Sequence, residues 1–307
     1  MPIRIPDNLP ARKTLEHEGV VVMDSSRAAR QDIRPLQIGL LNLVPNKERT
    51  ETQFTRLIGA TPLQVDLTLV RVTDHKSKNT SEDYLKSFYS TWEEVRARKF
   101  DGFVITGAPI ANMPFEEVRY WHEMVEIMNW TQTNVHQTMF ICWGAQAALH
   151  HFHKAKRYRM ASKAFGVFRH RIANPRSVWL RGFSDSPMIP VSRYNDIARD
   201  SLGPDLEVLI DNAEIGVCFI DDPKHRAVHM LNHLEYDNRS LADEYERDRK
   251  AGLDTPPPVN LFPNGDTSAE PENRWRSHAH LLFQNWINEI YQTTPFDIER
   301  VGKTGGG

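Results

Sequence analysis

Residues 138–149 have the sequence TMFICWGAQAAL, which predicts a buried strand followed at once by a helix. The apolar run extends from Thr138 to Ile141, and Cys142 stands at the change from strand to helix. We expect this turn to hold the sulfur at the edge of a sheet, over the N-terminus of the helix. The helix dipole and the free backbone N–H groups favour the thiolate there, so Cys142 is a candidate nucleophile.

A candidate base lies downstream, where a second apolar run, Ala227 to Leu231, is followed by His233 and Glu235. On an extended segment residues two apart share one side, so the carboxylate is placed to orient the imidazole. A buried cysteine alone is usually inert, and a His-x-Glu alone is usually a solvated pair. Their combination in one chain favours a catalytic Cys142, His233 and Glu235, the residues of an acyl-transfer site.

The composition is that of a globular protein with one large domain, or one domain with a substantial insertion. The chain has 307 residues, of which 40% are hydrophobic and 25% charged. Its net charge of −2 gives no electrostatic case for binding nucleic acid or an anionic membrane. Cys142 and Cys218 cannot build a disulfide framework. Without a signal peptide or a run of membrane-spanning length, the cytoplasm is the expected location.

Strands and helices alternate through the first half of the chain. We expect strands at 37–44, 63–72, 103–105 and 138–141, with helices at 50–58, 81–98 and 115–130. This order predicts an α/β fold with a mostly parallel central sheet flanked by helices. Further strands are expected at 164–168, 206–210, 215–220 and 227–231, several of them antiparallel, and C-terminal helices at 240–250 and 275–291.

The expected division is an N-terminal arm over residues 1–35, a single α/β domain over 36–297, and a disordered tail over 298–307. Ligands of open parallel sheets bind beyond the carboxyl ends of the strands. Three segments fall at such ends: 42–47, the TGAP turn at 106–109, and Cys142. One cleft is therefore expected to hold all three.

Collinear motifs along most of the chain point to one family. They are NLVPNK at 42–47, TETQF at 50–54, PLQV at 62–65, TGAP at 106–109, Phe115 to Trp121, Cys142-Trp143 with Gln146-Ala147, HLEYD at 233–237 and WRSH at 275–278. Together they resemble the homoserine O-acyltransferases of methionine biosynthesis, of the O-succinyltransferase type. The likeness extends roughly from Pro2 to Phe296 and implies the fold of class I glutamine amidotransferases, which is flavodoxin-like.

The resemblance implies a ping-pong reaction in which acyl-CoA acylates Cys142 and the homoserine hydroxyl then takes the acyl group. His233 would move the protons and Glu235 would hold the imidazole. Backbone N–H groups of Trp143 and of Ile110 would stabilise the oxyanion. Acyl-CoA is then a co-substrate and no further cofactor is expected; a homodimer is left open.

The same resemblance assigns the homoserine contacts to Lys163, Ser192 and Arg247. Arginine suits a planar carboxylate, although Lys163 and Arg247 taken alone would be read as surface charges. Because Asn46 replaces a frequent lysine of the family, Lys47 is left to supply positive charge near the acyl donor. Asn232 and Leu234 stand where glycine and proline are usual, and neither change removes a catalytic group.

Ala111 occupies the position at which, by the same resemblance, the choice of acyl donor is made. Family members that use succinyl-CoA carry glycine here, and those that use acetyl-CoA carry glutamate. A methyl group neither fills the acyl pocket nor repels the succinyl carboxylate, so Ala111 favours succinyl-CoA. Acetyl-CoA stays the alternative donor, since one methyl group discriminates only modestly.

Two other classes of protein stay open. A glutamine amidotransferase would share the nucleophile, base and fold, although Phe140 replaces the glycine usual two residues before its cysteine. A binding protein with a silent site is the second. We predict no metal site, because the histidines at 150, 151, 153, 278 and 280 have no carboxylate or cysteine at ligand spacing beside them in the sequence.

Overall fold

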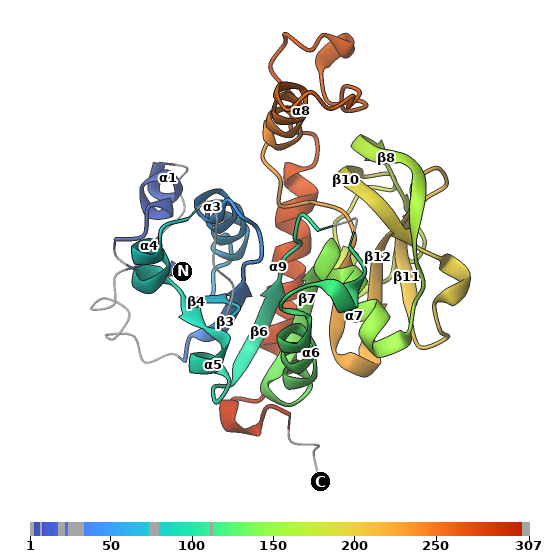
Figure 1. Ribbon diagram of the computed structural model, residues 1–307. Helices are drawn as coiled ribbons and strands as arrows, with labels where there is room; N and C mark the ends of the chain where they lie inside the picture. Colours follow the sequence, from blue (N-terminus) through green and yellow to red (C-terminus); the bar gives the residue numbers. More distant parts are fainter. Residues whose placement is uncertain are drawn as a thin grey trace.

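The computed structural model describes residues 3–6, 8–17, 22–23, 34–73, 80–110 and 113–302 (Figure 1). Its main feature is an 11-stranded sheet with the order β2-β1-β4-β3-β6-β7-β13-β12-β11-β9, in which β5 also pairs with β4. The strands from β2 to β13 are parallel to their neighbours, whereas β12, β11 and β9 add antiparallel pairs. The predicted α/β class with a mostly parallel sheet is confirmed.

The parallel strands are β1 (Ile3–Arg4), β2 (Val22–Met23), β3 (Leu36–Leu41), β4 (Val65–Arg71), β5 (Ser90–Thr91), β6 (Phe100–Ile105), β7 (Val135–Ile141) and β13 (Ala227–Met230). The antiparallel strands of this sheet are β9 (Arg171–Ile172), β11 (Glu207–Asn212) and β12 (Gly216–Asp222). From β3 the chain crosses to β4 on one side and later to β6 and β7 on the other. The carboxyl ends of β3 and β6 therefore flank a topological switch point, where such sheets bind ligands.

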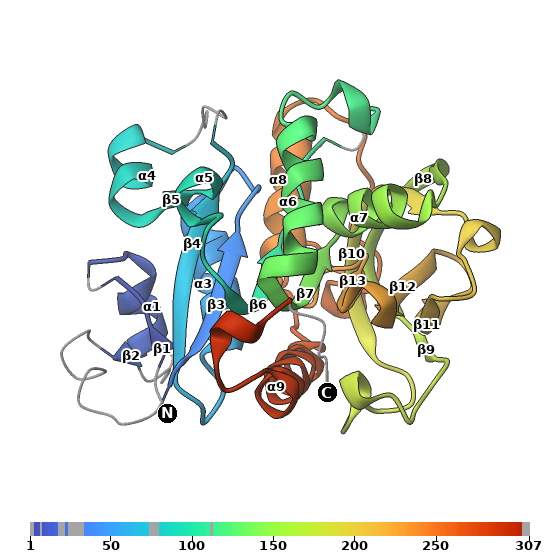
Figure 2. The same cartoon turned by 90° about the horizontal axis from the view of Figure 1, so that it is seen from below.

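Helices cover both faces of the sheet. The core on one face includes side chains from α1 (Ala11–His17), α3 (Lys47–Ile58) and α9 (Arg276–Thr293). The core on the other face includes side chains from α5 (Trp92–Val95), α6 (Trp121–Asn134) and α7 (Trp143–His153). Figure 2 shows α9 and the pair α6 and α7 on opposite sides of the strands. None of the helices in the described ranges is both long and apolar enough to cross a membrane.

A second, two-stranded sheet pairs β8 (Arg157–Arg169) antiparallel with β10 (Met188–Ile197). Figure 1 shows this two-stranded sheet beside α8 (Ser240–Lys250), which stands above the main sheet. The remaining helical segments are α4 (Glu82–Phe88) and the 3-10 turns η1 (Phe115–Glu117), η2 (Val178–Leu180), η3 (Arg199–Ser201), η4 (Pro223–His225), η5 (Pro263–Gly265) and η6 (Ile298–Arg300).

Several expected boundaries are wrong for identifiable reasons. The helix expected over 81–98 is broken into α4 and α5, because Ser90 and Thr91 pair with β4 and Thr91 then caps α5 in a capping box with Glu94. The helix expected over 115–130 begins as η1 and becomes α6 only at Trp121. Strand β10 was not expected, since its sequence MIPVSRYNDI contains a proline and charged residues.

The two termini also differ from expectation. Part of the arm predicted over 1–35 joins the sheet, because β1 pairs with β4 and β2 pairs with β1. The tail is not disordered from 298 onward, because η6 forms there and Val301 is fully buried. The Gly-rich end at 303–307 lies outside the described residues.

Candidate active site

Cys142 stands between β7 and α7 in a strained backbone conformation. Its φ is 51° and its ψ −114°, in a region that residues other than glycine rarely adopt. Its N–H donates to the carbonyl of Met230 at 2.7 Å, and its carbonyl accepts from the N–H of Gln146 at 3.0 Å. These bonds hold the strained strand-to-helix turn, which has the geometry of the nucleophile elbow in α/β-hydrolases. The predicted strand-to-helix turn at Cys142 is confirmed.

Two glycines allow the close packing of this turn. A methyl group at Gly107, in the loop after β6, would lie 3.0 Å from Cβ and 3.5 Å from Sγ of Cys142. A methyl group at Gly144 would lie 2.8 Å from the carbonyl oxygen of Thr106. The first turn of α7 therefore packs directly on the end of β6. Sequence reasoning placed the TGAP turn near Cys142 but did not identify this steric requirement for glycine.

His233 follows β13 and pairs with Glu235 as the sequence predicted. Nδ1 of His233 lies 2.7 Å from Oε1 of Glu235, and both residues are buried. The backbone N–H of His233 donates to the carbonyl of Pro190 at 3.0 Å. The ring of Tyr236 stacks on the imidazole, with centroids 4.2 Å apart and an interplanar angle of 15°. The imidazole is therefore fixed on two sides.

The pKa of His233 depends on its interaction with Cys142. Burial alone would lower the pKa of His233, but the negative charges of Cys142 and Glu235, and hydrogen bonds to both, raise this pKa well above 6.5. The raised pKa favours the protonated imidazole of His233, which lies between the sulfur of Cys142 and the carboxylate of Glu235. Such a pair supplies a nucleophile together with a proton donor for the leaving group.

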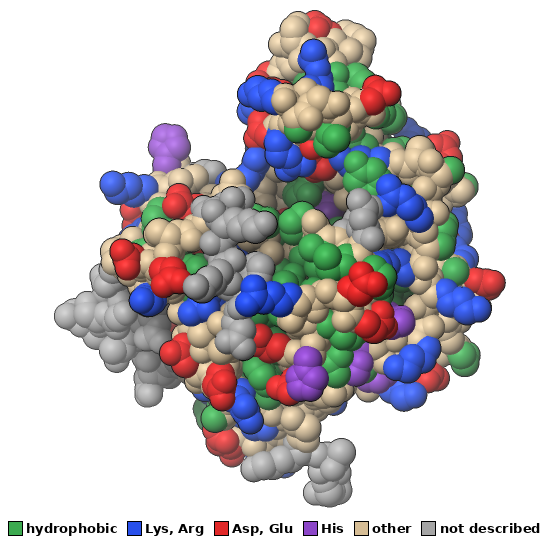
Figure 3. All heavy atoms as spheres, in the orientation of Figure 1, with side chains coloured by type: hydrophobic (Ala, Val, Ile, Leu, Met, Phe, Trp, Pro, Cys, Tyr) green, Lys and Arg blue, Asp and Glu red, His purple; other side chains and the backbone are tan. Residues whose placement is uncertain are grey.

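A cavity of about 1020 Å³ opens in front of Cys142 and His233. It is lined by residues 44–46 after β3, residues 106–110 after β6, and Cys142 after β7, so the three segments expected at one cleft do meet there. Side chains of β8, β10 and α8 close the opposite wall. Figure 3 shows hydrophobic side chains gathered at the centre of this face, below the projection formed by α8.

Lys163, Ser192 and Arg247 all line this cavity, and two carboxylates of α8 join them. Nζ of Lys163 lies 2.7 Å from Glu244 and 3.3 Å from Asp248. The hydroxyl of Ser192 donates to Glu244 at 2.7 Å, and the guanidinium of Arg247 lies 2.9 Å from Asp248. The side chain of Lys163 is 7% exposed and that of Arg247 is 69% exposed, so Arg247 is at the rim.

Glu244 was not singled out from the sequence. It lies in the charge-rich segment 243–249, which reads as a solvated helix face. The only available signal was its spacing, because residues three and four apart place Glu244, Arg247 and Asp248 on one side of α8. The cavity wall thus carries both a carboxylate and cations, which suits a ligand with an ammonium and a carboxylate group.

Residues 2–296 match the family model described as homoserine O-succinyltransferase. The chain belongs to the homoserine O-succinyltransferase family. It is 76% identical over 302 residues to the homoserine O-succinyltransferase of Pelagibacterium halotolerans, covering 98% of this chain and 99% of that protein. It is 59% identical over 304 residues to a homoserine O-acetyltransferase of Rhizobium leguminosarum bv. trifolii, covering 98% and 99%. The protein is thus an acyltransferase, as the sequence motifs implied.

Solved structures of glutamine amidotransferases share the fold of this family member. One from Thermotoga maritima aligns with a TM-score of 0.51 at 11% identity, covering 85% of this chain and 100% of that chain. One from Methylobacillus flagellatus aligns with a TM-score of 0.52 at 11% identity, covering 84% and 95%. At this identity the likeness concerns the fold alone, and it confirms the predicted class I glutamine amidotransferase-like architecture.

Lys47 was expected to supply positive charge near the acyl donor, but the structure places its side chain elsewhere. Its ammonium donates to the carbonyl of Asn42 and lies 5.6 Å from the ring centroid of Tyr89, and the side chain is absent from the lining of the cavity as far as the described residues define it. Burial lowers the pKa of Lys47 to about 8, against the opposing effect of Glu51. The expected donor-site charge is therefore corrected: Lys47 belongs to a buried polar cluster behind the cavity.

The two N–H groups expected to stabilise the oxyanion, those of Ile110 and Trp143, differ in whether they already donate a hydrogen bond. The N–H of Ile110 donates to the carbonyl of Ala108 at 2.9 Å in the free protein, so it would have to leave this partner to stabilise an oxyanion. Trp143 opens α7, where the first N–H groups have no partner within the helix. Its nitrogen is 3.6 Å from the position that a Cβ of Gly107 would take, close to the sulfur. Ala111, the donor-specificity position, lies outside the described residues.

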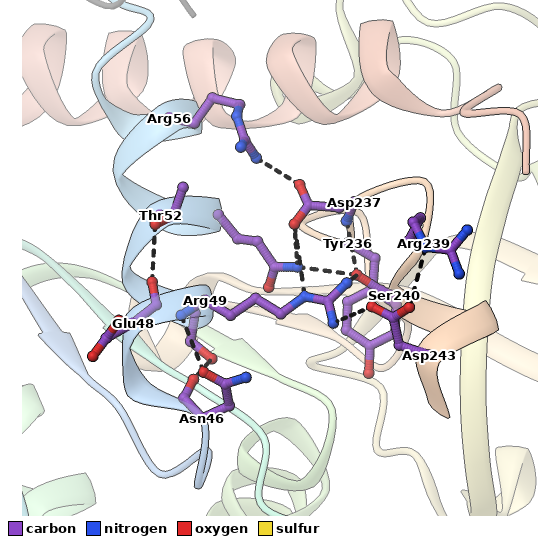
Figure 4. A network of polar contacts seen from close by, with 12 residues as sticks. Asn46, Glu48, Arg49, Thr52, Arg56, Tyr236, Asp237, Arg239, Ser240 and Asp243 are labelled. Carbon is purple, nitrogen blue, oxygen red and sulfur yellow. Dashed lines mark hydrogen bonds and ion pairs between the residues drawn. The ribbon is translucent and has the colours of Figure 1, made fainter. Parts of the chain in front are cut away.

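A polar network fixes the segment after Glu235 to α3 (Figure 4). The guanidinium of Arg49 lies 2.7 Å from Asp243, and that of Arg56 lies 2.8 Å from Asp237. Gln53 donates to Asp237 at 3.1 Å. Because Asp237 is only two residues beyond Glu235, these contacts help to position the His233–Glu235 pair.

The α7 histidines require a further correction. Nε2 of His153 lies 2.6 Å from Oδ2 of Asp222, so a carboxylate does accompany this histidine. This contact could not be predicted from the sequence, because Asp222, at the end of β12, is distant in the chain from His153, at the end of α7. His150 pairs instead with Glu116 at 3.3 Å, and His151 contacts Asn129 at 2.8 Å.

Proposed function

We propose that this protein transfers an acyl group, succinyl in preference to acetyl, from acyl-CoA to the hydroxyl of homoserine through a thioester at Cys142. The observation that carries the proposal is the contact of Cys142 with the His233–Glu235 pair at the wall of the cavity that holds Lys163 and Glu244. Family membership and the names of the relatives support the substrates.

In the first half-reaction the sulfur of Cys142 attacks the thioester carbonyl of the acyl-CoA. The bond between the carbonyl carbon and the CoA sulfur breaks, and His233 gives its proton to the departing CoA thiolate. The N–H of Trp143 is placed to stabilise the oxyanion that forms in between. Glu235 keeps the imidazole in position and compensates its charge while it is protonated.

In the second half-reaction His233, now neutral, takes the proton of the homoserine hydroxyl. The oxygen attacks the thioester carbonyl, and the sulfur of Cys142 leaves as the thiolate beside the new imidazolium, which restores the starting state. Both substrates supply all the atoms of the product, so the cycle needs no cofactor. The protein would perform this reaction in the cytoplasm.

The wall formed by α8, β8 and β10 is suited to homoserine. Arg247 at the rim offers a planar fork for the carboxylate, and Glu244 offers a negative charge for the ammonium. In the free protein Lys163 and Ser192 already bind Glu244, so these groups hold its carboxylate in a defined place. Bound homoserine would then complete a network of alternating charges.

Succinyl-CoA is the proposed donor on two grounds. The relative at 76% identity bears the O-succinyltransferase name, whereas the relative at 59% bears the O-acetyltransferase name. Ala111 is small and uncharged, so it does not repel the succinyl carboxylate. Ile110 and Met113, which stand on either side of Ala111 in the sequence, line the cavity, and this supports the assignment.

Steady-state assays of CoA release with homoserine and each donor test the proposal. We expect kcat/KM for succinyl-CoA to exceed that for acetyl-CoA at least about 10-fold. An equal or reversed ratio would refute the donor assignment while leaving the acyl transfer intact. Ammonia release from glutamine without any acyl-CoA would instead favour an amidotransferase. Absence of both activities, with Cys142 no more reactive toward iodoacetamide than a free thiol, would favour a silent binding protein.

A further inference from the structure

A buried carboxylate surrounded by histidines lies at the far end of the helix that begins after Cys142. Asp222 ends β12, His153 ends α7, His225 ends η4, and His229 lies in β13. Oδ2 of Asp222 is 2.6 Å from Nε2 of His153, 3.0 Å from Nδ1 of His225 and 3.3 Å from Nε2 of His229. Three separate segments of the chain therefore deliver imidazole nitrogens to one carboxylate.

The geometry of three of these groups is that of a metal-binding set. The ligand atoms of His153, Asp222 and His225 all lie within 4.8 Å of one another. The side chains of His153 and His225 are 7% and 16% exposed, whereas that of Asp222 is fully buried. The set thus opens toward solvent on the side of the two histidines, which gives an ion a way in.

The charge of the cluster also calls for a cation. A carboxylate withdrawn from water needs a positive partner, because burial penalises its charge heavily. The side chain of Asp222 is fully buried, and the imidazoles of His153, His225 and His229 lie within 3.3 Å of its carboxylate. Either a proton on one imidazole or a bound cation must compensate it.

We propose that His153, Asp222 and His225 bind a divalent transition-metal ion of the zinc class. Two imidazole nitrogens and one carboxylate oxygen are a common ligand set for such ions, with the remaining positions left to water. His229 and Phe152, which are not among the proposed ligands, hold the ligands in place. His229 donates to the carboxylate from the buried side, and the ring of Phe152 stacks on that of His225 at 4.4 Å between centroids.

The position of the site implies a structural task. The helix α7 starts directly after Cys142, and β13 leads directly to His233. An ion at the end of α7 would join the helix that carries the nucleophile to the β12–β13 connection that precedes the base. The 11 residues of α7 span about 16 Å, so the ion would act on stability and not on the reacting atoms.

Titration with Co²⁺ tests the site, because imidazole and carboxylate ligation gives this ion a visible absorption band. The protein should be free of a polyhistidine tag and carry Cys142→Ser, since a thiolate beside His233 would bind the same ions. The variants His153→Ala and His225→Ala each remove one ligand. His151→Ala is the matched control, because His151 lies on the same helix but contacts Asn129.

We expect one equivalent of Co²⁺ to bind, to be displaced by Zn²⁺, and to raise the midpoint of thermal unfolding. Each ligand variant should weaken binding at least about 10-fold, while His151→Ala should not change it. Circular dichroism and the unfolding midpoint without metal verify that the variants fold. No saturable binding by the parent, unchanged binding in both ligand variants, or an equal effect of Mg²⁺, which prefers oxygen ligands, would each overturn the proposal.

Discussion

Oε1 of Glu235 lies 2.7 Å from Nδ1 of His233, and both side chains are buried. The carboxylate therefore fixes the imidazole so that its other nitrogen is turned to Cys142, and it also stabilises the positive charge of His233. Two neighbours in the chain are thus linked to a cysteine that follows a different strand. This relationship is the basis of the mechanism proposed above.

Glu235→Gln should keep the shape of the side chain and remove its charge. We expect kcat to fall by about 10²–10⁴, because an amide neither compensates the imidazolium nor enforces the required tautomer. KM for homoserine should change little. Steady-state kinetics with both substrates, together with circular dichroism to verify folding, provide the measurement. A folded variant with the turnover of the parent would show that Glu235 is not needed to orient the base.

Gly107→Ala should disturb the nucleophile through sterics alone. The added methyl group would lie 3.0 Å from Cβ of Cys142, so the elbow must shift. Because a small displacement of a reacting group is costly, we expect kcat to fall about 10²-fold. Gly203→Ala is the matched control, since a Cβ there meets nothing within 4 Å. Equal activity of the two variants would contradict the proposed close packing.

Ala111→Glu should shift the donor preference toward acetyl-CoA. A glutamate would occupy space in the acyl pocket and repel the carboxylate of a succinyl group. We expect the ratio of kcat/KM for succinyl-CoA to that for acetyl-CoA to fall at least about 10-fold. Ala111→Gln separates charge from size, because it adds nearly the same volume without the charge. An unchanged ratio in Ala111→Glu would refute this account of donor choice.

His170 should make stability depend on pH. Burial lowers its pKa to about 4 from the ordinary 6.5, and its Nε2 lies 2.8 Å from the amide nitrogen of Asn232, next to His233. Between pH 6.5 and pH 4 the unfolded chain therefore takes up a proton that the folded protein does not. The stabilising contribution is fully present above pH 6.5 and is lost as the pH falls toward 4.

His170→Gln lacks this proton and serves as the comparison. Across that window the free energy of unfolding should fall by about 3 kcal/mol more in the parent than in the variant. Urea unfolding at pH values above and below the window measures the difference, and contributions from other groups cancel between the two proteins. Parallel pH profiles would show that His170 is not held neutral by its surroundings.

The sequence was sufficient for the architecture and for the elements that bear the reacting groups. The apolar runs before Cys142 and His233 identified β7 and β13, and both side chains lie at strand ends as expected. The alternation of strands and helices predicted the parallel sheet. These signals are local in the chain, because hydrophobic periodicity and a change of secondary structure are properties of short segments.

Contacts between residues that are distant in the chain could not be predicted from these local patterns. Lys47 was expected near the donor, but its ammonium donates to the nearby carbonyl of Asn42 and lies over the ring of Tyr89, which follows α4. The requirement for glycine at Gly107 depends on the position of Cys142 across the sheet, and the pairing of His153 with Asp222 depends on the end of β12. Such contacts arise from packing between distant segments, which periodicity does not encode.

The most direct test is the intact mass of the protein after mixing with succinyl-CoA in the absence of homoserine. We predict a mass increase equal to one succinyl group, located on Cys142 by peptide mapping, and its loss when homoserine is added. Cys142→Ala should show no increase and no turnover. Turnover by the parent without any acylated protein, or an acyl group on a different residue that homoserine discharges, would contradict the covalent role of Cys142.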